Sequence, residues 1–165
     1  MKIFIILSTV LLSFFSNIKD QTALTSKEVE MILERHNYWR SDVGISEELE
    51  WSEEMAELAA DWARQLKKNG CGWEHRTNNK FGENLFKGTT GYYDAAYVVD
   101  AWGSEKEFYN YNKNSCKRGE MCGHYTQMVW KTTTKVGCAK ITCDGMDIWV
   151  CNYDPPGNWV GEKPY

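Results

Sequence analysis

The segment Gly123-His-Tyr-Thr-Gln-Met-Val-Trp130 is the most informative part of this chain. It places His124 beside a hydroxyl, an amide and aromatic rings, and Cys122 comes directly before the segment. A second segment, Cys151-Asn-Tyr-Asp-Pro-Pro-Gly-Asn-Trp159, is nearly as distinctive and also begins at a cysteine. Both segments combine a cysteine with aromatic and polar residues, and the first also contains a histidine.

The six cysteines all lie in the second half or near the middle of the chain, at Cys71, Cys116, Cys122, Cys138, Cys143 and Cys151. An even number of cysteines in a secreted chain predicts three disulfides. The alternatives are free thiols in the core or a zinc site. A cysteine zinc site is disfavoured because no Cys-x-x-Cys pair is present.

A tight hairpin is predicted where Asp144-Gly145 separates two runs of strand-forming residues, 136–142 and 146–153. A two-residue loop sets a register in which Cys138 lies directly opposite Cys151. Side chains opposed in this way are close enough for a disulfide when the pair is a non-hydrogen-bonded one. The same register aligns the apolar residues of both strands on one face, so two independent features agree on it.

The remaining cysteines can then be assigned. Cys143 points to the face opposite Cys138 and needs a partner from another part of the chain. Cys116 and Cys122 are close enough in sequence to close a loop on each other, which leaves Cys71 for Cys143. This is one of about 15 pairings that six cysteines allow.

Helical periodicity in the first two thirds of the chain predicts three helices and a shorter one, over residues 25–40, 52–68 and 93–102 and from about residue 105. Residues 69–92 and 110–123 are expected to be surface connections. His36 falls near the apolar stripe of the first helix. We expect it to be a hydrogen-bonded histidine of the core or of an interface between elements.

The chain has 165 residues, which is enough for one domain with a core of its own. Residues 1–20 begin with Met-Lys, continue in a short apolar run and end in polar residues, as a secretory signal peptide does. The apolar run is shorter than the ~20 residues that span a bilayer. We therefore expect a secreted, extracellular protein without stable membrane insertion. An uncleaved anchor or a buried helix is the alternative.

The formal net charge is −4 at pH 7. An acidic chain is repelled by phosphate backbones and by anionic lipid surfaces. The one basic cluster, formed by Lys113, Lys117 and Arg118, is diluted by Glu120. Nucleic acid is therefore not an expected partner.

The segments 123–130 and 151–159 resemble the two signature motifs of the CAP superfamily, which includes cysteine-rich secretory proteins, insect antigen 5 and plant pathogenesis-related proteins of group one. The resemblance runs from about Leu24 to Tyr165 and implies a single CAP domain, also called an SCP domain, over residues 21–165. The implied fold is of the α+β class: a three-layer α-β-α sandwich with a small antiparallel sheet and three disulfides. The family shows the disulfide pairing given above, and the chain resembles its venom-allergen-like secreted members.

The resemblance also implies a site. Two histidines and two glutamates meet in a central cleft in this family, and the matching positions are His75, Glu83, Glu105 and His124. Two imidazoles and two carboxylates suit zinc or another divalent cation. The histidines alone are a possible ligand set, with the glutamates behind them. The same groups suit acid–base chemistry, or a hydrogen-bonded network that only organises the loops.

Common hydrolase motifs are absent, since neither Gly-x-Ser-x-Gly nor His-Glu-x-x-His occurs. If all six cysteines are paired, none is left as a nucleophile. The sequence therefore favours a binding protein over an enzyme. A cation-dependent hydrolase or protease that uses the His/Glu cleft is the alternative.

Phe108, Tyr109 and Tyr111 lead into the loop that Cys116 and Cys122 are predicted to close. Relatives that bind sterols use an aromatic loop at this position, so the resemblance implies a lipid, sterol-like partner. Aromatic side chains with polar tips suit a ring-shaped ligand at a wet surface. The alternatives are that these rings pack beneath the loop, that the partner is an extracellular protein, or that the domain is a disulfide-stapled scaffold recognised through its loops.

Overall fold

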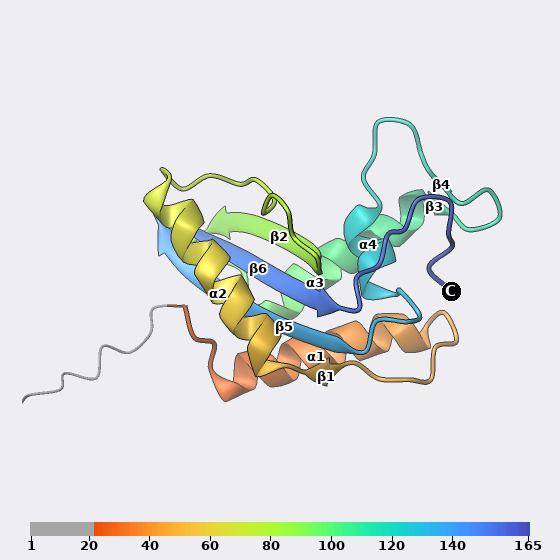
Figure 1. Ribbon diagram of the computed structural model, residues 1–165, viewed down its shortest axis with the longest axis horizontal. Coiled ribbons are helices and arrows are strands. Elements are labelled where there is room, and N and C mark those ends of the chain that lie inside the picture. Colours follow the sequence, from red (N-terminus) through yellow and green to blue (C-terminus); the bar gives the residue numbers. More distant parts are fainter. Residues whose placement is uncertain (1–21) are drawn as a thin grey trace, which may run out of the picture.

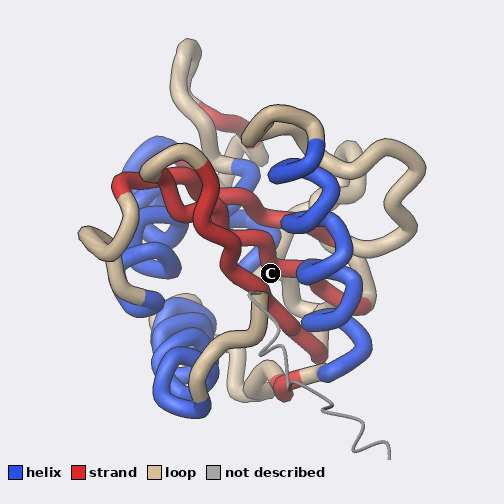
Figure 2. Tube along the Cα trace, turned by 90° about the vertical axis from the view of Figure 1, so that its left-hand side faces the viewer, coloured by secondary structure: helices blue, strands red, loops and turns tan. Residues whose placement is uncertain are grey.

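A four-stranded sheet runs through the middle of the molecule with helices on both of its faces, so the domain has three layers (Figures 1 and 2). The computed structural model describes residues 22–165. The signal peptide predicted for residues 1–20 lies outside the described residues. Among residues 22–165, no helix is both long and apolar enough to cross a membrane.

The sheet has the order β1-β5-β6-β2, with β1 at Glu50–Trp51, β2 at Gly82–Thr89, β5 at Lys135–Cys143 and β6 at Met146–Asp154. The predicted hairpin of β5 and β6 is confirmed, because Cys143 pairs with Met146 and Cys138 with Cys151. Asp144 and Gly145 both have positive φ, 50° and 73°. That backbone suits the two-residue turns whose twist matches the strands.

The predicted α+β fold with three layers is confirmed, and its sheet is antiparallel except for β1, which pairs in parallel with the start of β5. One prediction about the sheet needs correction. Residues 69–92 are not all surface connection, since β2 pairs with β6 along its whole length. Glycine, asparagine and lysine in β2 are weak strand formers. The strand forms because β6 offers it a complete row of backbone partners.

Two larger helices and one shorter helix cover the sheet: α1 at Ser26–Ser41, α2 at Glu53–Lys68 and α3 at Ala95–Ser104. Thr25 and Glu28 form the predicted capping box at the start of α1. Helix α2 covers one face, and α1 and α3 pack together on the other (Figure 2). The core is correspondingly divided into an α2 side and an α1–α3 side.

The short elements lie at one end of the molecule, next to the C-terminal segment (Figure 1). They are the 3-10 helix η1 at Glu105–Phe108, the paired strands β3 at Tyr109–Asn110 and β4 at Ser115–Cys116, and helix α4 at Gly123–Met128. The connection predicted for residues 110–123 therefore includes part of a small hairpin. The short helical element expected from Glu105 is a 3-10 helix.

All three predicted disulfides are present, and no cysteine is free. The Cα atoms of Cys138 and Cys151 are 4.1 Å apart, which fits a directly opposed, non-hydrogen-bonded pair. The Cys71–Cys143 bond ties the segment after α2 to the hairpin turn. The Cys116–Cys122 bond ties β4 to the start of α4.

Candidate functional site

Four elements bring the predicted site residues to the same end of the sheet. His75 lies in the loop before β2, Glu83 lies in β2, Glu105 begins η1, and His124 is in the first turn of α4. Asn84 links β2 to α4 because its side-chain amide donates to the backbone carbonyl of His124, at 3.1 Å. The four side chains form two histidine–glutamate pairs.

In the first pair, His75 Nδ1 lies 2.7 Å from Glu83 Oε1. The same carboxylate oxygen accepts the backbone N–H of Arg76, at 3.1 Å. Glu83 Oε2 is buried and has no hydrogen-bond partner among the described residues. The hydrogen bond to Glu83 raises the pKa of His75, and the negative charge of Glu83 adds to this effect, although partial burial opposes it.

In the second pair, His124 Nδ1 lies 2.6 Å from Glu105 Oε1. Glu105 Oε2 accepts the backbone N–H groups of His124 and Tyr125, at 3.0 and 3.2 Å. Glu105 therefore caps the N-terminal end of α4, whose first N–H groups have no partner within the helix. The imidazole also stacks on Trp102, with ring centroids 6.1 Å apart.

A hollow of about 260 Å³ joins the two pairs. Both histidines and Glu83 line it, together with Asn84, Met121, Cys122, Gly123 and Asn158. Glu105 is not part of the wall and contacts the His124 ring at Nδ1. The sequence did not single out Asn84 and Asn158, although the first follows Glu83 and the second lies within the segment 151–159.

The two imidazoles present the same chemistry. In each ring Nδ1 faces a carboxylate, and no described residue makes a hydrogen bond to Nε2. A carboxylate that accepts from one ring nitrogen fixes the tautomer and makes the other nitrogen a better metal ligand. The arrangement therefore suits two histidine ligands, with Glu105 as an orienting group and Glu83 Oε2 as a further oxygen.

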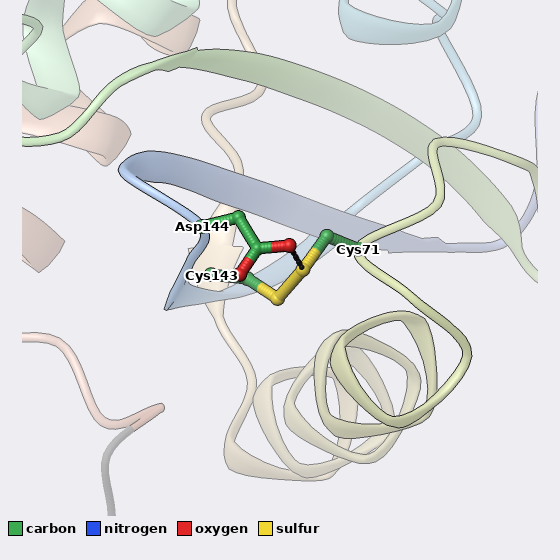
Figure 3. A group of neighbouring side chains, drawn as sticks. All are labelled: Cys71, Cys143 and Asp144. Carbon is green, nitrogen blue, oxygen red and sulfur yellow. Dashed lines mark hydrogen bonds between the residues drawn. A yellow bond between two sulfur atoms is a disulfide. The ribbon is translucent and has the colours of Figure 1, made fainter.

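Only one group of three possible ligand side chains within residues 22–165 has all its ligand atoms within 4.8 Å of one another: Cys71, Cys143 and Asp144 (Figure 3). This group does not suit a metal because its two sulfurs are bonded to each other. Asp144 Oδ2 lies 3.2 Å from the sulfur of Cys71. The four His/Glu side chains thus stand as two pairs around a hollow, not as one closed ligand cluster.

The aromatic residues predicted to bind lipid contact other parts of the chain. The hydroxyl of Tyr109 donates to Asn114, at 2.7 Å, and Lys117 lies over the ring of Phe108. The ring of Tyr111 stacks on Tyr165, with centroids 4.7 Å apart. These contacts support the alternative in which the rings pack beneath the loop.

A second hollow of about 350 Å³ lies beside this loop. Its wall includes Tyr109, the Cys116–Cys122 disulfide, Trp130 and the exposed ring of Trp159. It shares Cys122, Gly123 and Asn158 with the hollow of the histidines, so the two cavities are neighbours.

His36 is a hydrogen-bonded histidine of the core, which was one of its two predicted roles. The side chain is fully buried, Nδ1 lies 2.8 Å from the carbonyl of Ile32, and Nε2 lies 2.9 Å from the hydroxyl of Tyr153. Burial lowers the pKa of His36 to about 4. The hydroxyl of Tyr153 also accepts a hydrogen bond from Asn84. His36 therefore contacts the site through Tyr153 and does not itself line the hollow.

Comparison with known proteins gives consistent matches. The model of the cysteine-rich secretory protein family, CAP, matches residues 33–153. Pathogenesis-related protein PR-1 of Medicago truncatula is 48% identical over 131 residues, which cover 78% of this chain and 74% of the relative. Pathogenesis-related protein 1A of Nicotiana tabacum is 39% identical over 163 residues, covering 98% and 94%. A crystal structure of NaASP2 with Zn2+ is 26% identical, covers 86% of each chain and has a TM-score of 0.69.

Proposed function

Because this chain belongs to the cysteine-rich secretory protein family, CAP, we propose that it is a secreted binding protein whose His/Glu cleft holds a divalent cation such as zinc. The observation that carries the proposal is the pair of carboxylate-oriented imidazoles on one hollow. The described residues contain no free cysteine and no helix that could span a membrane, which agrees with an extracellular role.

The types of donor atom suit zinc, although the ligand atoms of His75, His124 and Glu83 do not all lie within 4.8 Å of one another. His75 and His124 would bind through Nε2, and the unpartnered Oε2 of Glu83 is a buried acceptor beside the same hollow. Zinc takes imidazole nitrogen and carboxylate oxygen readily and would supply an open coordination position for an oxygen of a partner. The relative crystallised with Zn2+ supports the choice of this ion.

Binding is favoured over turnover by the partners of Glu105 and Ser104. Both oxygens of Glu105 already accept hydrogen bonds. A general base needs an oxygen within reach of the substrate proton. Ser104 Oγ donates to the backbone carbonyl of Ala101 and forms no hydrogen bond with His124 among the described residues.

Zinc titration calorimetry tests the cleft. Alanine at His75 or at His124 should lower zinc affinity by more than ~100-fold, since even residues behind metal ligands are worth 10–100-fold. His75→Ala is the cleaner variant because the side chain of His75 is 61% exposed. Asp144→Asn is the matched control for the cysteine group and should bind zinc like the wild type. Unchanged affinity in both histidine variants would remove the cation from the proposal.

The organic partner is proposed to be a lipid of sterol-like shape, or else an extracellular protein, at the second hollow. Apolar walls with aromatic rings are typical of sites for such ligands. Trp159 is 57% exposed and lines this hollow, whereas Trp73 is 51% exposed and does not. The two tryptophans therefore form a matched pair for mutation.

A radiolabelled sterol should bind the wild type and Trp73→Ala equally and should bind Trp159→Ala about tenfold more weakly, because a tryptophan ring supplies much contact area. Equal weakening by both changes would indicate non-specific adsorption to exposed rings. No sterol binding by the wild type would leave the extracellular protein as the partner.

A further inference from the structure

The outer face of α1 forms one wall of a groove that is separate from both hollows. The groove has a volume of about 550 Å³, and its other wall is the segment leading into β1. The accessible apolar part of its lining comes from Leu33 and from Tyr38, which is 50% exposed, whereas Leu49 is buried beneath them at 3% exposed. None of its lining residues belongs to the hollow of the histidines.

Three exposed carboxylates edge this groove: Glu30, Glu34 and Glu48. None of them forms an ion pair within the described part of the chain. Glu30 and Glu34 stand one helical turn apart, and like charges at this spacing destabilise a helix by a few tenths of a kcal/mol. A bound cation would relieve that repulsion.

Among the described residues that line the groove, the one cationic side chain is neutralised by an ion pair. Arg35 forms an ion pair with Asp100, at 2.8 Å, and its guanidinium lies over the ring of Tyr38. The groove therefore keeps a net negative charge. The negative charge of the whole chain, −4, would steer a positive partner toward it.

The two walls of the groove are fixed to each other. Asn37 of α1 accepts the backbone N–H of Leu49, at 2.8 Å, and donates to the carbonyl of Leu49, at 3.4 Å. This amide holds the backbone before β1 against the helix. A groove held open in this way does not have to be ordered on binding, which favours affinity.

We propose that this groove docks a basic segment of another protein. Lysine or arginine side chains of the segment would lie against Glu30, Glu34 and Glu48. An apolar side chain between them would lie over Leu33 and beside Tyr38. The apolar contact distinguishes this occupant from a simple polycation. The docking surface is independent of the cation and of the lipid proposed above.

The test uses the fluorescein-labelled peptide Lys-Leu-Lys-Lys-Leu-Lys as probe, followed by fluorescence anisotropy. The triple variant Glu30→Gln, Glu34→Gln and Glu48→Gln should bind it about tenfold more weakly, as expected for three exposed ion pairs. The control triple Glu57→Gln, Glu107→Gln and Glu162→Gln changes the net charge equally and should remain within about twofold of the wild type. Equal weakening in both triples would overturn the proposal, because the probe would then sense only net charge.

Two further measurements identify the occupant. Replacing both leucines of the probe by glycine should weaken binding to the wild type, and spermine should compete poorly with the original probe. Equal binding of the glycine peptide, or strong competition by spermine, would overturn a peptide segment in favour of a small polycation. A dimer of the free wild type that the groove triple dissociates would assign this face to a second copy of the chain.

Discussion

The two histidine–glutamate pairs differ in which partner the fold protects. In the first pair the Glu83 side chain is 5% exposed and the His75 side chain is 61% exposed. In the second pair the side chains of His124 and Glu105 are 13% and 12% exposed. The histidine–glutamate hydrogen bond therefore lies at an open surface in the first pair and in a mostly buried position in the second.

The carboxylates also have different additional partners. Glu105 uses its second oxygen to cap α4, whereas the second oxygen of Glu83 is buried without a partner among the described residues. These partners indicate a division of work: the Glu105 pair fixes the start of α4 behind the wall of the cleft, and the Glu83 pair keeps one carboxylate oxygen without a partner among the described residues.

Acidification should have the largest effect on the free energy of unfolding. It should act through His36 and not through either histidine–glutamate pair. Burial lowers the pKa of His36 from 6.5 to about 4, so the unfolded chain binds more protons between these pH values. The contribution of His36 to stability is complete above pH 6.5 and is lost as the pH falls toward 4. The loss is about 3 kcal/mol in total. Urea denaturation between pH 7 and pH 4 measures it.

The variant His36→Gln is the control for this prediction. Glutamine keeps an amide that can bond to the carbonyl of Ile32 and to the hydroxyl of Tyr153, but it does not titrate. Its free energy of unfolding should fall less steeply with acid than that of the wild type. Parallel curves for the two proteins would place the acid sensitivity elsewhere, in the pairs or in other carboxylates.

Removing each carboxylate compares the pairs directly. Glu105→Ala deletes the acceptor of three hydrogen bonds, from the His124 ring and from the backbone of His124 and Tyr125. We expect it to lower the free energy of unfolding by about 2 kcal/mol. Glu83→Ala deletes the acceptor of two hydrogen bonds, from His75 and from the backbone of Arg76. It also removes a buried oxygen that has no partner among the described residues, which offsets part of the loss, so its effect should be smaller, about 1 kcal/mol.

The exposed neighbour Glu107 supplies the control, and Glu107→Ala should stay within about 0.5 kcal/mol of the wild type. Urea denaturation at neutral pH measures all three variants. A larger loss for Glu83→Ala than for Glu105→Ala would reverse the division of work between the two pairs.

How far the sequence predicts this molecule depends on how local the deciding interactions are. The hairpin of β5 and β6 was predictable because Asp144-Gly145 sets its register and the Cys138–Cys151 bond confirms it. Strand β2 was not predictable from its own residues, because its stability comes from pairing with a distant strand. Local patterns describe turns and helix caps well, and non-local backbone pairing much less well.

The site shows the same limit. The resemblance to a family predicted that these four residues meet in one cleft, but it did not predict that they form two histidine–glutamate pairs. The capping role of Glu105 depends on α4, a six-residue helix that the periodicity of the sequence did not predict. The position of Asn84 in the wall of the cleft follows from the register of β2 with β6, which the sequence did not predict.

The smallest effect concerns the ionisation of His75. Its hydrogen bond to Glu83 raises the pKa of His75, so this pair stabilises the fold below the usual histidine pKa and loses that contribution as the pH rises through the raised value. In Glu83→Gln the pKa of His75 should return toward its usual value, whereas in Glu105→Gln it should stay where it is in the wild type. NMR titration of the imidazole resonances of the metal-free protein measures both. If Glu105→Gln shifted the pKa of His75 as much as Glu83→Gln does, the two pairs would form one coupled network, and the division of work between them would be wrong.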